Sequence, residues 1–150
     1  SLGKEVFIIQ KKNLEELASF DSKYFGANRL KVLERLYRDY PENCLVAREG
    51  RRIIGYIVGR KTLRGYWLGP WVCDPRRLDV AKELFLSCVG ALDGKGELRL
   101  GMPAVNPSGM RLMMDLGFRQ VSKSVRMVWG KHEYSGKPEG VFSIGGPEKG

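Results

Sequence analysis

The sequence contains a single histidine, His132, and no long run of apolar residues. With one histidine and no cluster of cysteines or carboxylates at ligand spacing, we expect neither a metal site nor a histidine-based catalytic triad. No apolar stretch approaches the roughly 18 residues that a membrane-spanning helix needs. The segment KEVFII near the start is too short for a signal peptide and has no cleavage signature. We therefore expect no metal cofactor and no contact with a membrane.

Cysteines are also few. Cys44, Cys73 and Cys88 are odd in number, and each lies inside an apolar run. Cysteines in such positions usually pack as small core residues, and free thiols are typical of reducing compartments. For Cys73 this interpretation is favoured over a reactive thiol, because no neighbour in the sequence would stabilise its thiolate. We expect a cytoplasmic protein.

The chain has 150 residues and a mass of 17.0 kDa, enough for one domain with a hydrophobic core. We expect this domain at residues 3–150, with Ser1 and Leu2 left over from cloning. A start without methionine also fits a domain cut from a longer two-domain protein. The 26 basic and 17 acidic residues give a formal net charge of +9, which fits an anionic partner or simply a solvated basic surface. We do not expect nucleic acid, because no zinc-finger, helix-turn-helix or aromatic RNA-binding signature is present.

Apolar periodicity predicts alternating strands and helices along most of the chain. Strands are expected at residues 4–10, 44–48, 52–60, 65–72, 97–101, from 118 onward, at 124–129 and at 141–144. Helices are expected at residues 13–20, 29–39, 77–92 and 108–116, the last capped by Ser108. This order predicts an α/β fold with a mixed, mostly antiparallel twisted sheet of about six or seven strands and about four helices. It includes one strand–helix–strand crossover.

The joint between the strand at 65–72 and the next helix is the first candidate site. A helix N-terminus leaves amide N–H groups unpaired and attracts phosphate, and flanking arginines strengthen such a site. The groups available for a diphosphate are Arg76, Arg77 and the amides of Leu78, Asp79, Val80 and Ala81. Both arginines could equally be solvated. The Asp79 carboxylate would also repel phosphate from the first turn.

A second pattern is AVNPSGMRLMMDLGF at residues 104–118. Gly117 fits the position just after a helix, and Phe118 would anchor the chain that follows. Capping and packing are sufficient reasons for these two residues. They are a weaker reason for Asn106, whose polar side chain comes where a strand is expected to separate from its neighbour.

Together, the two stretches resemble the GNAT superfamily of acetyl-CoA-dependent N-acetyltransferases, in element order from about Lys4 to Trp129. In that family a loop of the form Arg/Gln-x-x-Gly-x-Gly/Ala binds the CoA diphosphate, and Arg76–Ala81 takes its place here. The family's later Asn-x-x-Ala-x-x-Leu-Tyr-x-x-x-Gly-Phe stretch corresponds to Asn106–Phe118.

The resemblance implies acetyl-CoA as co-substrate, with an amine attacking the thioester carbonyl directly. Backbone N–H groups of a splayed strand, here Trp71, Val72 and Cys73, would polarise that carbonyl. The pantetheine arm would pair as a pseudo-strand in the slot between the strands at 65–72 and 97–101. Asn106 would cap the amides of this arm.

Further stretches are similar to the C-terminal GNAT-like domain of two-domain bacterial and archaeal acetyltransferases. These are an Asp…Phe-Gly-x-x-Arg pattern at Asp21, Phe25, Gly26 and Arg29, a Gly-Pro strand at Gly69 and Pro70, and an Arg-Met pair at Arg126 and Met127. The similarity implies a partner GNAT domain or a second copy of the chain. As residue types alone, Asp21 and Arg29 could equally form an ion pair between helices.

Two positions depart from the family pattern. Asp79 replaces the central glycine of the diphosphate loop, and Met113 replaces the tyrosine that protonates the leaving thiolate in many relatives. No motif marks a catalytic base either. The candidates are the carboxylates of Asp21 and Glu49 and the phenol of Tyr134, each of which also fits a surface or capping role.

The sequence leaves two main hypotheses, and a third, a basic nucleic-acid-binding module, is supported by the net charge alone. The first is an acetyl-CoA-dependent N-acetyltransferase that acts on a small-molecule or peptide amine. The second is a non-catalytic GNAT-like module that binds a ligand or packs against a partner domain. Asn106, Arg76 and the strand–helix joint favour the first hypothesis, whereas Asp79 and Met113 favour the second.

Overall fold

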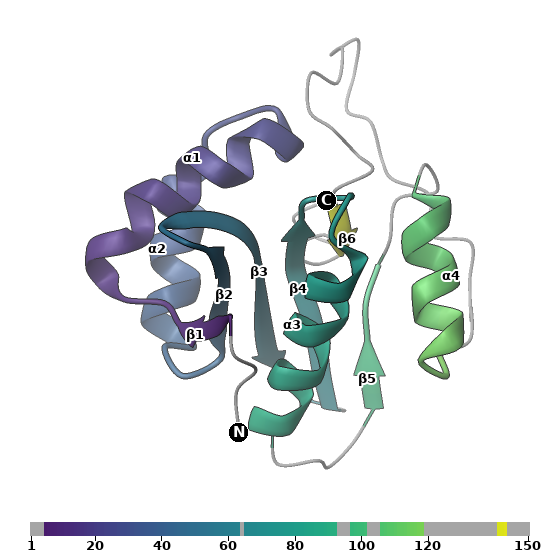
Figure 1. The fold of residues 1–150 in the computed structure, drawn as a ribbon. Coiled ribbons are helices and arrows are strands. Elements are labelled where there is room, and N and C mark those ends of the chain that lie inside the picture. Colours follow the sequence, from purple (N-terminus) through teal and green to yellow (C-terminus); the bar gives the residue numbers. More distant parts are fainter. Residues whose placement is uncertain (1–4, 64, 93–96, 102–105, 119–140, 144–150) are drawn as a thin grey trace, which may run out of the picture.

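The computed structural model describes residues 5–63, 65–92, 97–101, 106–118 and 141–143 (Figure 1). Along the chain the elements are β1 (Val6–Ile8), a 3-10 turn η1 (Lys11–Asn13), α1 (Leu14–Phe25), α2 (Leu30–Asp39), β2 (Cys44–Glu49), β3 (Arg52–Lys61), β4 (Gly65–Cys73), α3 (Leu78–Ala91), β5 (Glu97–Arg99), α4 (Pro107–Asp115) and β6 (Val141–Ser143). The strands expected from 118 onward and at 124–129 fall at positions outside the described residues, apart from Phe118 itself.

Six strands of the described residues form one sheet in the order β1-β2-β3-β4-β5, with β6 also paired to β4. The pairs from β1 to β4 are antiparallel, whereas β4 and β5 run parallel because α3 crosses over between them. The predicted α/β class, with a mixed and mostly antiparallel sheet, is therefore confirmed.

Helices cover both faces of the sheet. α1 and α2 pack on one face, and α3 and α4 pack on the other (Figure 1). On the α3 face, the wholly buried Trp71 stacks on Phe85 with ring centroids 5.8 Å apart. On the α1 face, Leu17 and Leu33 pack with Tyr56 of β3. Each side chain of this kind contributes roughly 1.5–3 kcal/mol when buried. Burial on two faces explains why β2, β3 and β4 are nearly continuous apolar runs.

Two local predictions need correction. Helix α1 does not stop near Phe20 but continues to Phe25 and ends at Gly26, whose φ is 91°. It continues because Asp21, which lies on the buried face, is neutralised by Arg29 at 2.7 Å. The N-cap of α4 is Asn106 and not Ser108. The Asn106 side chain accepts a hydrogen bond from the Gly109 N–H.

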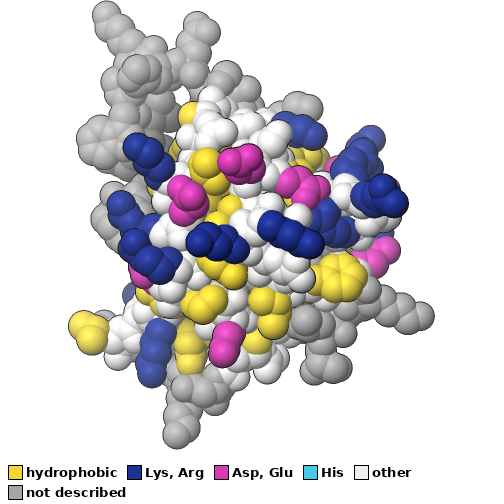
Figure 2. Space-filling view, turned by 90° about the vertical axis from the view of Figure 1, so that its left-hand side faces the viewer, with side chains coloured by type: hydrophobic (Ala, Val, Ile, Leu, Met, Phe, Trp, Pro, Cys, Tyr) yellow, Lys and Arg dark blue, Asp and Glu magenta, His cyan; other side chains and the backbone are white. Residues whose placement is uncertain are grey.

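The surface formed by α1 and α2 carries charges of both signs (Figure 2). On α2, the exposed Lys31, Arg35 and Arg38 are interspersed with the exposed Glu34 and Asp39. In the described part of this face, the excess of positive charge is therefore not gathered into one patch. No helix among the described residues has the length and apolar character needed to cross a bilayer.

Candidate functional site

Strands β4 and β5 separate partway along β4. They are paired at Gly65, Tyr66 and Trp67, but β4 continues to Cys73. At the paired end the strands approach so closely that a Cβ added to Gly65 would lie 2.1 Å from the Glu97 carbonyl oxygen. Further along, two residues of β4 lie opposite the single residue between Ile57 and Gly59 of β3, which is a bulge. Because a bulge bends its own strand, β4 diverges from β5 beyond it.

The separated edge of β4 presents the backbone groups of Trp71 and Cys73. Asp74 donates its N–H to the Ile54 carbonyl at 2.8 Å, so the Asp74 backbone faces β3. Backbone groups alternate in direction along a strand, and Val72 therefore faces β3 as well. Trp71 and Cys73 face the opposite side, where β5 lies. Of the three residues whose amides are expected to polarise a carbonyl, Trp71 and Cys73 face the side of β5, and Val72 faces β3.

Strand β6 lies along the same edge of β4 (Figure 1). It runs antiparallel, with Ser143 opposite Trp71 and Val141 opposite Val72. The other edge of β4 is already paired with Tyr56 of β3 and its neighbours, so β6 is on the side that faces β5. The sequence predicted a strand at 141–144, but nothing in its pattern indicated which strand it would join.

The loop after β4 holds Arg76 against Asp74. The Arg76 side chain donates to the Asp74 carboxylate at 3.1 and 2.9 Å, and the Arg76 backbone N–H donates at 3.0 Å. These contacts lower the pKa of the Asp74 carboxyl, and the hydrogen bond from the Arg76 side chain is the largest cause. Arg76 is exposed, as expected for a ligand-binding residue, but its guanidinium already forms an ion pair with the Asp74 carboxylate.

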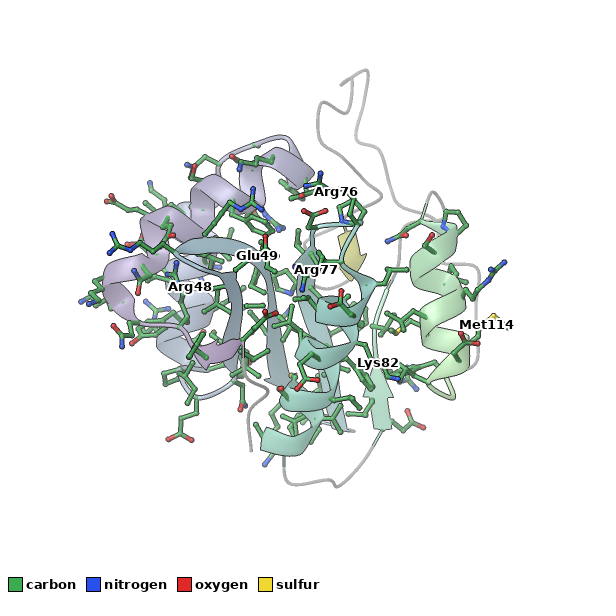
Figure 3. All side chains as sticks on the ribbon, viewed as in Figure 1. Arg48, Glu49, Arg76, Arg77, Lys82 and Met114 are labelled. Atoms are coloured by element: carbon green, nitrogen blue, oxygen red, sulfur yellow. The ribbon has the colours of Figure 1, made fainter. Side chains whose placement is uncertain are left out.

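Arg77 lies near Glu49 (Figure 3) and contacts carboxylates from three parts of the chain. It donates to both oxygens of Asp79 at 3.1 Å, it also contacts the Glu49 carboxylate, and Glu5 lies 3.5 Å away. The loop after β4 and the first turn of α3 thus hold Arg76 and Arg77 among four carboxylates, those of Glu5, Glu49, Asp74 and Asp79. A diphosphate bound here would have to displace at least the contact between Arg77 and Asp79.

The first turn of α3 also uses its own amides. Val80 and Ala81 donate to the Arg77 carbonyl at 3.0 and 3.1 Å, and their side chains are buried in the core. The pKa of the Asp79 carboxyl is lowered, first by the hydrogen bond from Arg77 and also by the backbone N–H groups of Val80 and Asp79. The Asp79 carboxylate, next to the exposed Leu78, thus lies at the position predicted for a diphosphate.

Helix α4 places the two remaining motif residues. Asn106 is 1% exposed, and its side-chain oxygen accepts the Gly109 N–H at 2.9 Å, so it caps its own helix. Met113 is 4% exposed and packs in the core on the α3 side of the sheet. A thioether cannot donate a proton, and this position therefore supplies no acid.

Asp21, a candidate base, is fully buried in a hydrogen-bonded network. Arg29 donates to its two oxygens at 2.8 and 2.7 Å, and the Tyr56 hydroxyl donates at 2.6 Å. Burial is the main cause that raises the pKa of Tyr56, and the charge of Asp21 adds to it. Asp21 therefore ties α1 to β3 and has little freedom to accept a proton from a substrate. Nothing in the sequence indicates that Tyr56 completes this network.

The other candidates differ in exposure. Glu49 is half exposed at the end of β2, between Arg52 at 3.3 Å and Arg77. Tyr134 lies outside the described residues. Burial, followed by the charge of Asp74, raises the pKa of Cys73 to about 12, so this thiol is a core residue and not a nucleophile. In the described part of the chain, no three residues of the metal-binding types converge.

Comparisons with known proteins agree with this architecture. A family model described as "Acetyltransferase (GNAT) domain" matches residues 17–143. Ard1 from Thermoplasma volcanium superposes with a TM-score of 0.67 at 18% identity, over 78% of this chain and 83% of that protein. The ribosomal-protein-S18-alanine N-acetyltransferase from Escherichia coli superposes with a TM-score of 0.65 at 15% identity, over 78% of each chain. At such identities, these two similarities concern the fold.

A curated relative extends the comparison. The holothin acyltransferase of Pseudoalteromonas sp. (strain SANK 73390) is 24% identical over 138 residues, which are 92% of this chain and 46% of the relative. The chain thus spans about half the length of the curated relative that it matches.

Proposed function

Because the chain belongs to the GNAT acetyltransferase family, we propose that it transfers an acetyl group from acetyl-CoA to an amine. The observation that carries this proposal is the separated edge of β4. There the strand leaves β5 after Trp67, and the backbone groups of Trp71 and Cys73 face outward from the paired part of the sheet. Such an edge can pair with the amides of an extended pantetheine arm and hold the thioester beside fixed N–H donors.

In the proposed reaction the amine nitrogen bonds to the acetyl carbonyl carbon, and the bond from that carbon to sulfur breaks. The amine loses one proton, the thiolate gains one, and the products are an amide and free CoA. An outward N–H of Trp71 or Cys73 would donate to the carbonyl oxygen as negative charge develops on it. This donor is held in position by the sheet before the reaction begins.

Proton transfer is the weak part of this site. Met113 cannot protonate the thiolate, and Asp21 is held by Arg29 and Tyr56. We propose that water takes up the proton that the amine nitrogen loses and supplies one to the thiolate. A well-placed acid or base typically contributes roughly 10²–10⁴ in rate, so turnover should be slow compared with relatives that retain the tyrosine.

We propose a small-molecule or peptide amine as the acceptor. The named relatives differ in this respect: one name refers to holothin and the other to a ribosomal-protein alanine. A second GNAT domain or a second copy of the chain remains the proposed protein partner. The free, buried thiols of Cys44, Cys73 and Cys88 support a cytoplasmic location.

Calorimetric titration with acetyl-CoA and with free CoA tests the proposal. Saturable binding of both ligands is expected, together with thiol release when acetyl-CoA and a panel of amines are supplied. Absence of binding at millimolar ligand would reject the enzymatic proposal. It would leave the second candidate function, a non-catalytic GNAT-like module, which the Arg77–Asp79 pair and Met113 favour.

The diphosphate position has a separate test. Arg76→Ala and Arg77→Ala should each weaken CoA binding, because a phosphate that displaces their carboxylates gains their charge. Arg38→Ala, at an exposed arginine of α2, is the matched control and should leave CoA affinity unchanged. If the two loop variants behaved like the control, the diphosphate would have to bind elsewhere.

A further inference from the structure

Strand β6 occupies the edge of β4 that the proposed function assigns to the pantetheine arm. We infer that β6 and the arm compete for this edge, so that the chain's own strand lowers its affinity for acyl-CoA. The inference rests on the proposed function, because that function places the arm beside Trp71 and Cys73.

The competition follows from the geometry of one strand. One edge of β4 is paired with β3, where Tyr56 lies opposite Val72 and Ile57 opposite Trp71. A further partner can therefore pair only with the other edge. On that edge Trp71 lies opposite Ser143. The outward N–H and carbonyl of Trp71 are thus used by β6, and an extended arm would need the same two groups.

The pairing is also short enough to be displaced. β6 has three residues, and its register on β4 shifts between the two paired positions. One net backbone hydrogen bond changes an equilibrium constant by about fivefold, so a strand paired at two positions is mostly bound but can leave. The apparent affinity of a ligand that needs the edge is its intrinsic affinity multiplied by the fraction of chains in which the edge is open.

A comparison of Ser143→Pro with Ser143→Ala tests this competition in the full chain. Because Ser143 lies opposite the outward-facing Trp71, its backbone N–H faces β4. Proline removes that N–H, whereas alanine keeps it and changes only the side chain. Hydrogen exchange of the Trp71 amide reports the pairing without any ligand, and we expect faster exchange in Ser143→Pro alone.

The second measurement is binding of two probes by calorimetry. We expect free CoA to bind about tenfold more tightly to Ser143→Pro than to Ser143→Ala. Adenosine 3′,5′-bisphosphate, which lacks the pantetheine arm, should bind both variants equally.

Each other outcome is decisive. Unchanged exchange at Trp71 would overturn the pairing, and with it the inference. Faster exchange with equal CoA affinity in the two variants would overturn the competition but leave the proposed function intact. Faster exchange without CoA binding in either variant would overturn the proposed function, and the inference that rests on it.

Discussion

Two arginines of this protein, Arg29 and Arg77, are held by carboxylates in opposite surroundings. The Arg29 side chain is 12% exposed and its partner Asp21 is fully buried. The Arg77 side chain is 28% exposed, and its partners Asp79 and Glu49 are 70% and 49% exposed. A buried pair is expensive to break because a lone charge would remain in the core, whereas exposed pairs contribute little and exchange readily. The same kind of contact is therefore a structural tie in one region and a replaceable contact in the other.

The causes of the pKa shifts differ in the same way. Burial by itself lowers the pKa of Arg29, but the charges and hydrogen bonds of Tyr56 and Asp21 outweigh it, and the net pKa is raised. The pKa of Arg77 is raised mainly by its hydrogen bonds to Asp79. Arg29 thus depends on partners enclosed with it, and Arg77 on partners that water or a phosphate can replace. A sequence pattern of arginine near aspartate does not distinguish these two situations.

The largest expected effect comes from breaking the buried pair. Arg29→Met would leave the Asp21 carboxylate without its main partner and remove the contact of the guanidinium with the Phe25 ring, 3.7 Å away. We expect the free energy of unfolding to fall by about 3–5 kcal/mol, measured by urea denaturation. Arg38→Ala, at a 73% exposed arginine, is the control and should cost less than about 1 kcal/mol.

If Arg29→Met does not fold, the free energy of unfolding can be measured on the double variant that also carries Asp21→Asn. Neutralising Asp21 removes the buried charge and should recover part of the lost stability. If Arg29→Met alone were no less stable than the Arg38→Ala control, the contrast between buried and exposed ion pairs would be contradicted.

The fold could be predicted from the sequence wherever one local pattern decided the structure. The stripe of Val80, Leu84 and Cys88 indicated α3, and the structure has this helix within one residue at each end. The end of α1 could not be placed in this way. Asp21 looks like a break in the apolar pattern, and its burial depends on Arg29 and Tyr56, which reach it only after the chain has folded.

The site was less predictable for a related reason. The positions Arg76, Arg77 and Asn106 could be singled out from the strand–helix joint and the resemblance to the GNAT family, but their partners could not. Asp79 could be suspected because it is two residues from Arg77, whereas Glu49 comes from a distant strand. Pairing between segments far apart in sequence is set by the tertiary fold, and the same limit applied to β6 and β4.

The replaceable character of the exposed corner gives the second prediction. Asp79→Asn removes the charge that opposes a phosphate but keeps a side chain of the same shape in the first turn of α3. We expect CoA affinity to rise by about fivefold, the effect of removing one unfavourable charge near the surface. Calorimetry measures this, and Asp115→Asn on the exposed side of α4 is the matched control. Equal affinities in the two variants would show that Asp79 does not face the bound anion.

The smallest expected effect concerns an exposed pair away from the site. Arg48 donates to both oxygens of Glu16 at 2.9 Å, and this contact lowers the pKa of Glu16 below its ordinary value of 4.5. A lowered pKa in the folded state stabilises the protein above the ordinary value, and the stabilisation disappears as the pH falls through the lowered one. Glu16→Gln should therefore cost less than about 1 kcal/mol near neutral pH and nothing in strong acid. Glu15→Gln shares the helix turn and its dipole. The difference between the two variants, followed by denaturation across this pH range, therefore isolates the contacts of Glu16 with Arg48 and with Asn13, which donates at 3.4 Å. A difference that persisted below the lowered pKa would mean that Glu16 acts through packing, and the exposed pairs would then resemble the buried one.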